Sequence, residues 1–137
     1  WAQGWSEPNA GSDMAAIRST AKLEGDKYII NGQKTWSTRA VWADWCFGMF
    51  RTDPDSERHR GLTFILVPLK SAGITVRPIP QLDGLPGFAE IFFDNVEVVL
   101  KIVWVTKGQL ERGDGHHGEE REVHQLVGHV LHLRVLD

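Results

Sequence analysis

Short apolar segments separated by turn-forming residues fill most of the chain between residues 19 and 98, and this spacing restricts the fold more than any other feature. Each segment is too short for a typical helix, and several are rich in β-branched or aromatic residues. The predicted strands lie at residues 19–23, 28–30, 34–38, 43–51, 61–68, 73–77 and 89–93. Many strands with turn signals between them predict an all-β fold, an antiparallel barrel or an orthogonal sandwich.

The turn residues give the expected connections. Gly25-Asp26 suits a hairpin turn, and Asn31-Gly32 favours a second turn of type I′ directly after it. Two hairpins in succession would form an antiparallel meander. Pro78 is expected to end the strand at residues 73–77 because proline has no backbone N–H for a sheet ladder.

Residues 3–13 form a different kind of segment, rich in residues that bend the backbone or carry hydroxyls. Pro8 fixes its own φ and Gly11 tolerates positive φ, so we expect a tight, irregular turn. Ser12 or Asp13 can then cap a short helical turn. A helical start offers free N–H groups that favour phosphate, although an ordinary capped turn explains the same residues.

Composition excludes several classes of protein. Hydrophobic residues make up 42% and charged residues 24% of the 137, which is ordinary for a globular domain. The net charge of −3 argues against nucleic acid as a partner. No apolar run approaches the length of a membrane span. The single cysteine, Cys46, excludes an internal disulfide framework and fits a reducing compartment.

Two residue types are unevenly distributed. Five of the six tryptophans fall in the first 45 residues, which indicates an aromatic-lined surface or pocket, although core filling is the commoner use. Five of the six histidines fall in the last 22 residues, at positions 116, 117, 124, 129 and 132. Their spacing fits no standard zinc motif, so we interpret residues 99–137 as an atypical tail, weakly helical or disordered, without a metal site.

Several motifs occur in a fixed order along residues 1–98. They are Gln-Gly-Trp-Ser-Glu-Pro-Asn-Ala-Gly-Ser-Asp at 3–13, Tyr-Ile-Ile-Asn-Gly-Gln-Lys-Thr-Trp-Ser-Thr at 28–38, Ala-Asp-Trp at 43–45, Gly-Leu-Thr-Phe-Ile-Leu-Val at 61–67 and Phe-Phe-Asp-Asn-Val at 92–96. Together they resemble the middle domain of acyl-CoA dehydrogenases. The resemblance implies a β-barrel that lies between two helical domains and carries FAD across its face.

The resemblance also implies which residues contact the flavin. Carried over by position, they are Gln3, Trp5, Ser6, Gly11, Ser12, Trp36, Ser37 and Thr38. The Ser6 and Thr38 hydroxyls can donate to the polar edge of the ring, including the region of N5, and the Trp36 ring can lie against the isoalloxazine. Ser12 is also expected to meet the pyrophosphate or the acyl-CoA thioester region.

The implied reaction removes the α proton of an acyl-CoA with a glutamate base and transfers the β hydride to flavin N5. In the family that base comes from the helical C-terminal domain, and neither Glu7 nor Glu90 matches it. The resemblance therefore implies a fragment of a flavoprotein oxidoreductase of fatty acid metabolism, without a catalytic base and inactive alone. We expect weak or absent FAD binding, self-association through exposed apolar surface, and a cytoplasmic or mitochondrial matrix location. The family is homo-oligomeric.

The sequence departs from the family after Val98. Residues 109–115 read Gln-Leu-Glu-Arg-Gly-Asp-Gly and can be back-translated as CAG CTG GAA CGT GGC GAT GGC. One nucleotide later the same string reads Ser-Trp-Asn-Val-Ala-Met, which resembles the helix start that the family has next. We therefore hypothesise a change of reading frame near Val98, to be tested by sequencing the locus. The start at Trp1 is likewise expected to lie inside a longer protein.

Other classes remain open from the sequence. The chain could be a non-catalytic β-barrel that binds a partner. Acyl-CoA oxidases and flavin monooxygenases related to the family share the barrel, so a fragment of one of those is a further alternative.

Overall fold

The computed structural model describes residues 1–99 and 106–107, and strands dominate this part of the chain, which confirms the all-β prediction. The strands are β1 (Ala2–Gly4), β2 (Thr20–Glu24), β3 (Lys27–Thr38), β4 (Trp45–Arg51), β5 (Leu62–Pro68), β6 (Ile74–Ile79), β7 (Phe88–Val99) and β8 (Thr106–Lys107). Single turns of 3-10 helix connect some of them: η1 (Met14–Ala16), η2 (Ala40–Trp42) and η3 (Arg58–Gly61).

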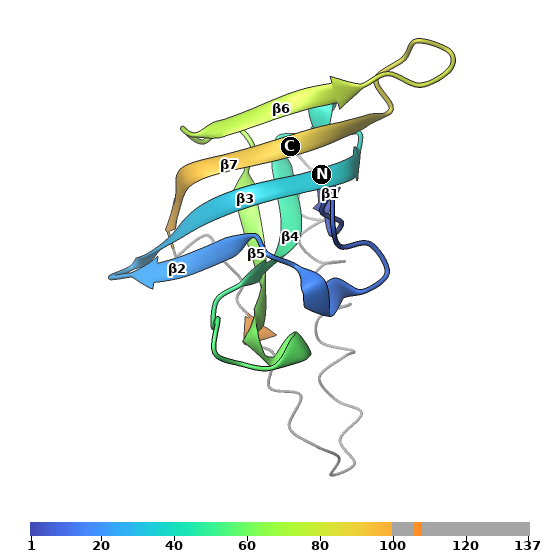
Figure 1. Ribbon diagram of the computed structural model, residues 1–137. Coiled ribbons are helices and arrows are strands. Elements are labelled where there is room, and N and C mark those ends of the chain that lie inside the picture. Colours follow the sequence, from blue (N-terminus) through green and yellow to red (C-terminus); the bar gives the residue numbers. More distant parts are fainter. Residues whose placement is uncertain (100–105, 108–137) are drawn as a thin grey trace, which may run out of the picture.

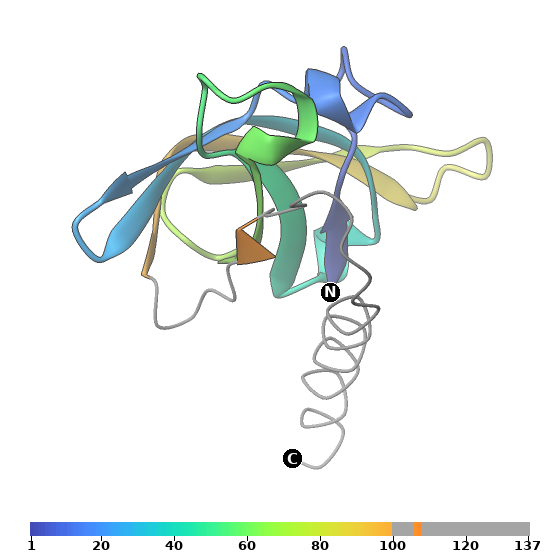
Figure 2. The ribbon, with the colours of Figure 1, turned by 90° about the horizontal axis from the view of Figure 1, so that it is seen from below.

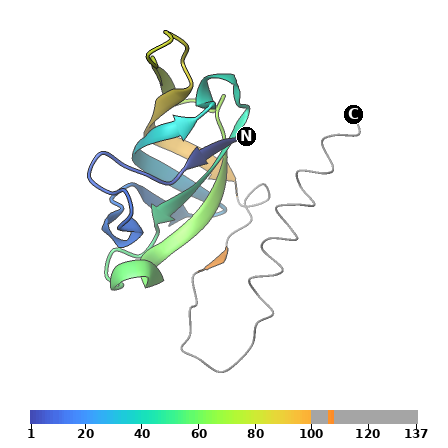
Figure 3. The ribbon, with the colours of Figure 1, turned by 90° about the vertical axis from the view of Figure 1, so that its right-hand side faces the viewer.

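The strands form one strongly curled sheet in the order β6-β7-β3-β2-β4-β5-β8, with β1 parallel to β4. The pair Thr20–Arg51 joins β2 to β4, and the sheet folds over at this junction. Figure 1 shows β6, β7, β3 and β2 side by side, with β4 and β5 crossing behind them at a steep angle. The view from below in Figure 2 shows β4 beneath the curved upper layer, and Figure 3 shows β1 beside β4. The result is a half-barrel.

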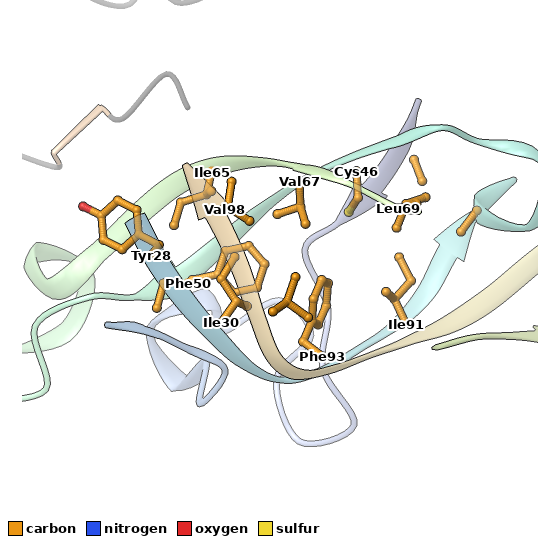
Figure 4. Packing of buried hydrophobic residues seen from close by; sticks show 14 of the residues in the cluster. Tyr28, Ile30, Cys46, Phe50, Ile65, Val67, Leu69, Ile91, Phe93 and Val98 are labelled. Carbon is orange, nitrogen blue, oxygen red and sulfur yellow. The ribbon is translucent and has the colours of Figure 1, made fainter. Parts of the chain in front are cut away.

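The core lies between the two layers. Figure 4 shows Ile65 and Val67 of β5 facing Ile30 of β3 and Phe93 of β7 across the interior. The rings of Phe50 and Phe93 meet edge to face with their centroids 5.4 Å apart, an arrangement that aromatic pairs favour. Buried and half-buried residues alternate along β4 and, from Thr63 onward, along β5, so these apolar strands cover the core with one face.

The two longest strands correct the predicted meander. The Gly25-Asp26 hairpin between β2 and β3 is confirmed. The Asn31-Gly32 turn is wrong, because β3 runs through both residues for 12 residues. A type I′ turn needs positive φ at both central residues, and here only Gly32 has it, at φ 140°. The Asn31 side chain instead bonds Asn95, the extra residue of a bulge in β7, whose N–H donates to Asn31 Oδ1 at 2.9 Å.

Two further boundaries differ from the predictions. β7 passes through the Asp94-Asn95 pair and reaches Val99, well beyond the predicted end at residue 93. β6 contains Pro78, which was expected to end it. β6 is the outer strand of its layer and pairs with β7, so a residue without an N–H is tolerated there. The short helical turn expected after residue 13 forms as η1, but no side chain caps it.

At the opposite edge of the sheet, β5 is paired along only part of its length by β8. β8 pairs with Thr63 and Phe64 of β5, while residues 65–68 of β5 pair with β4 alone among the described residues. The expectations for the tail, namely a weak helix, a histidine cluster and a frame change, otherwise concern residues outside the described ones. Within the described residues, no helix is long and apolar enough to cross a membrane.

Candidate functional site

Residues 3–13 begin as β1 and then form a tight turn. β1 packs closely on β4: a Cβ at Gly4 would lie 2.8 Å from Cys46 Sγ, so a larger residue at this crossing would force a neighbour to shift. Glu7 and Ala10 then exchange two backbone hydrogen bonds of 2.8 and 3.0 Å around Pro8-Asn9. The predicted tight turn is therefore confirmed, and it is formed without positive φ at Gly11.

A buried ion pair fixes this turn to the sheet. Lys34 of β3 is fully buried, and its Nζ donates to Glu7 Oε1 at 2.8 Å. The same Nζ also donates to the carbonyl of Met49 at 2.6 Å and to that of Trp5 at 3.4 Å. The three N–H donors of the lysine thus meet three acceptors, and its ammonium lies 5.0 Å from the centroid of the Phe50 ring.

The Glu7 carboxylate is equally well satisfied. Besides Lys34, it accepts the backbone N–H of Arg18 at 2.7 Å and that of Ser19 at 3.0 Å. Burial raises the pKa of Glu7, but the bonds and charge of Lys34 and the two N–H donors outweigh it, so the pKa lies below its usual value. Burial lowers the pKa of the Lys34 amine, and the Glu7 carboxylate offsets part of that change.

Trp36 is the centre of the second segment. The register of β3 against β7 shifts between Lys34 and Ser37, and Trp36 is the extra residue of this bulge. Its φ of 56° lies in the left-handed region, which is unusual for an aromatic residue and stores backbone strain. The bulge leaves the indole 61% exposed, edge to face with Phe88 at 6.1 Å. A core role for Trp36 is therefore excluded.

An open groove lies beside Trp36. It has a volume of about 560 Å³ and runs between Trp36, Phe88 and residues 79–83. The Arg39 N–H donates to the Gly87 carbonyl at 3.0 Å, which ties this loop to the start of η2. Most of the exposed large apolar side chains of the described chain belong to this end of the sheet: Trp36, Val41, Trp42, Leu82 and Leu85.

The structure brings the two predicted segments together through backbone contacts. The Thr35 N–H donates to the Ser6 carbonyl at 2.8 Å, and Lys34 bonds the Trp5 carbonyl. Ser6 therefore lies next to the bulge that presents Trp36. Thr38 is exposed, and Ser37 is fully buried with a hydroxyl that has no partner among the described residues.

The remaining predicted residues lie elsewhere on the same segment. The Trp5 indole packs on Phe47 and Phe64, with centroid distances of 5.4 and 5.9 Å, and Trp1 stacks on Trp45 nearby. This half-buried cluster covers the face of β4 and β5 opposite the core, and it bears out the predicted aromatic-lined surface. Gln3, Gly11 and Ser12 are exposed.

Sequence reasoning missed the Glu7–Lys34 pair. A signal was present, because Lys34 follows Tyr28 and Ile30 at even spacing along β3, both of which are buried, and a lysine on that face needs a buried acid. The groove was also missed, since residues 79–83 read as an ordinary loop. In the described part of the chain, no three His, Cys, Asp or Glu side chains are grouped to hold a metal ion. Burial raises the pKa of Cys46 to about 12, so its thiol is inert near neutral pH.

Comparisons with known proteins agree on one family. The family model described as "Acyl-CoA dehydrogenase, middle domain" matches residues 2–96. The acyl-CoA dehydrogenase IpdE1 of Mycobacterium tuberculosis is 48% identical over 141 aligned residues, which cover 93% of this chain and 37% of that protein. The chain thus spans little more than a third of this relative.

Solved structures share the fold. A glutaryl-coenzyme A dehydrogenase in complex with glutaryl-CoA superposes with a TM-score of 0.72 at 33% identity, over 78% of this chain and 27% of that one. The Tcur3481-Tcur3483 steroid ACAD superposes with a TM-score of 0.70 at 32% identity, over 74% of this chain and 26% of that one.

Proposed function

The chain belongs to the acyl-CoA dehydrogenase family through its middle domain, and on this premise we propose that it is the flavin-binding part of an enzyme that oxidises an acyl-CoA thioester. The observation that carries the proposal is the exposed Trp36 ring, presented by a strained bulge beside an open groove. Strain of this kind persists where the surrounding structure holds it, and it concentrates at functional sites.

The residues around Trp36 fit a flavin. A flat aromatic ring system suits the free face of the indole, where stacking adds apolar contact and excludes water. The Thr38 side chain is exposed two residues away, and the backbone bond between Ser6 and Thr35 brings Ser6 to the same bulge. Both hydroxyls can donate to the polar edge of the ring. When bound, the flavin would supply the hydride acceptor.

The other predicted residues have smaller proposed roles. Exposed Ser12 is available for the pyrophosphate or for the thioester region of the substrate, and Gly11 leaves space for close approach of backbone. Gln3 is exposed at the start of the segment. The ring of Trp5 is held in the aromatic cluster, so its contribution would come through its backbone. The Ser37 hydroxyl is fully buried and has no partner among the described residues, so a contribution of Ser37 would come through its backbone.

We propose that the described residues supply the binding face and that the base lies elsewhere in the enzyme. Glu7 is buried with three donors on its carboxylate, and Glu90 is bonded to Arg77 and Gln33, so neither is available to take a proton from a substrate. The substrate is proposed only as an acyl-CoA, because the similar solved structures range from a steroid ACAD to a glutaryl-coenzyme A dehydrogenase. A further similar structure is that of a ChsE4-ChsE5 complex, and we propose assembly with further subunits here too.

A flavin titration tests the proposal. FAD is added to the full chain and to a Trp36→Ala, Thr38→Ala variant, and flavin absorbance and fluorescence are followed. We expect the variant to bind at least about tenfold more weakly, which corresponds to about 1.4 kcal/mol. Trp42→Ala is the matched control, because Trp42 is 59% exposed, like Trp36, on the neighbouring η2. Equal loss in both variants contradicts a flavin site at Trp36, and no binding by the unmodified chain contradicts flavin binding by this part of the enzyme alone.

An activity measurement separates the binding face from the complete enzyme. With FAD, an acyl-CoA and an artificial electron acceptor, the isolated chain is expected to show no turnover above a control without protein. Turnover would show that a base was overlooked in this chain. Binding of a protein partner without any binding of FAD would support the alternative of a non-catalytic module.

A further inference from the structure

The Glu7–Lys34 pair joins four parts of the molecule at one point. Lys34 belongs to β3 and bonds the Met49 carbonyl of β4. Glu7 belongs to the turn after β1 and accepts the N–H groups of Arg18 and Ser19, which lead into β2. The pair therefore connects a turn that has no regular sheet pairing to β3, to β4 and to the start of β2.

The position of the pair relative to the proposed flavin residues is specific. Ser6 directly precedes Glu7, and Trp36 follows Lys34 by two residues. Between them, the Thr35 N–H donates to the Ser6 carbonyl, and Lys34 donates to the Trp5 carbonyl. Both segments of the proposed flavin site thus start at one buried cluster of hydrogen bonds. These bonds fix the distance between the two segments.

Stability alone is a weak reason for such a pair. Two buried charges lose their hydration, and well-packed apolar residues of similar size often stabilise a protein as much or more. An apolar pair would lose the directional hydrogen bonds. Only the lysine can donate to the Trp5 and Met49 carbonyls and to the Glu7 carboxylate at the same time. A buried polar cluster in which every donor has an acceptor specifies one arrangement of the chain.

We propose that Glu7 and Lys34 are positioning residues, which hold the turn that carries Ser6 in register with the bulge that presents Trp36. The part of this proposal that concerns flavin binding rests on the proposed function. The pair touches no cofactor itself. Its effect reaches the site through the backbone bond between Thr35 and Ser6.

Amide hydrogen exchange of the flavin-free chain is the primary test. In a Glu7→Gln, Lys34→Met variant, we expect the Thr35 amide to exchange at least roughly tenfold faster than in the unmodified chain, because its bond to Ser6 opens more often. The Leu69 amide is a matched reference: both residues are 8% exposed, and both amides donate to a backbone carbonyl at 2.8 Å. Leu69 is expected to keep its exchange rate.

The control variant is Arg77→Met, Glu90→Gln, which removes another ion pair from the sheet without touching the turn. This control variant should leave the exchange rate of the Thr35 amide unchanged. If Thr35 and Leu69 accelerate equally in the Glu7, Lys34 variant, the pair stabilises the whole fold and the positioning role is rejected. Unchanged exchange at Thr35 rejects it as well.

Flavin affinity is the second readout. Where the unmodified chain binds FAD, the Glu7, Lys34 variant should bind at least roughly tenfold more weakly and the Arg77, Glu90 variant about equally. Equal affinity in all three proteins overturns the positioning of the flavin site. If the unmodified chain binds no FAD, the proposed function fails for this chain, whereas the exchange of Thr35 still decides whether the pair holds the turn.

Discussion

Two loops flank Trp36, and they are held in opposite ways. The anchored loop, residues 3–13, has Glu7 and Ala10 buried and is bonded to β3, to β4 and to the two residues before β2. The open loop, residues 80–87, closes on itself through bonds such as Gln81 N–H to the Leu85 carbonyl at 2.9 Å, and Leu82 is fully exposed. The anchored loop, which carries polar side chains, is held in one place by buried bonds. The open loop, which borders the groove, exposes apolar side chains.

Removing the charge that holds the anchored loop should have the largest effect. Lys34→Met leaves the Glu7 carboxylate buried without its partner and removes a donor from the Trp5 and Met49 carbonyls. We expect a loss of about 3–5 kcal/mol in the free energy of unfolding. Arg77→Met, at a partly exposed pair on β6 and β7, should cost about 1 kcal/mol or less. Urea unfolding of both variants checks this, and similar losses would remove the contrast.

Two glycines with positive φ sharpen the comparison. Gly32 lies against Ser19, where a Cβ would fall 2.7 Å from the Ser19 Cα, whereas a Cβ at Gly84 of the open loop meets nothing within 4 Å. Both alanine variants suffer backbone strain of about 1–3 kcal/mol, because both φ values lie in the range that favours glycine. Gly32→Ala should lose about 1–3 kcal/mol more through overpacking. Equal melting temperatures would show that Ser19 and the anchored loop move aside easily.

Acid should weaken the anchored loop first. The folded pKa of Glu7 lies below the value of 4.5 for an unperturbed carboxyl, so its contribution to stability is present above pH 4.5 and is lost as the pH falls through the folded pKa. Unfolding free energy measured from pH 7 to pH 3 should therefore decline less steeply in Glu7→Gln, which starts from a lower stability. Parallel curves would mean that Glu7 titrates alike in the folded and unfolded chain.

Truncating the open loop should have the smallest effect on stability. Leu82→Ala together with Leu85→Ala removes side chains that are mostly in water, so unfolding should change by about 0.5 kcal/mol or less. The same change should reduce the predicted self-association, because it shrinks an exposed apolar patch. Sedimentation at several concentrations measures this, and unchanged association would point to the aromatic cluster of Trp1, Trp5 and Trp45 instead.

Local patterns predicted the strands well where the chain is regular. The apolar runs at residues 43–51 and 61–68 gave β4 and β5 to within about two residues, and Gly25-Asp26 gave the hairpin. Asn31-Gly32 misled, because the same dipeptide that suits a hairpin turn also suits the strand irregularity opposite a bulge, and only the pairing with β7 decides between them. The prediction that Pro78 ends its strand was wrong for a related reason. A proline is tolerated within β6 because β6 is an edge strand, which the local sequence does not show.

The sequence predicted the two segments of the proposed site, but it did not predict how they meet. The motifs singled out Ser6, Trp36 and Thr38, and the structure joins their segments through Thr35. The exposure of Trp36 depends on one extra residue in β3 relative to β7, a count that needs both strands. The Glu7–Lys34 pair spans 27 positions, so no local pattern connects its members.

Pro78 also has a consequence for how the sheet meets other chains. A strand that approached β6 would find a proline at one of the positions where a backbone N–H donor is needed. Pro78 therefore disfavours lengthening of the sheet from the β6 edge. A strand added to this edge by design would have to leave that position unpaired.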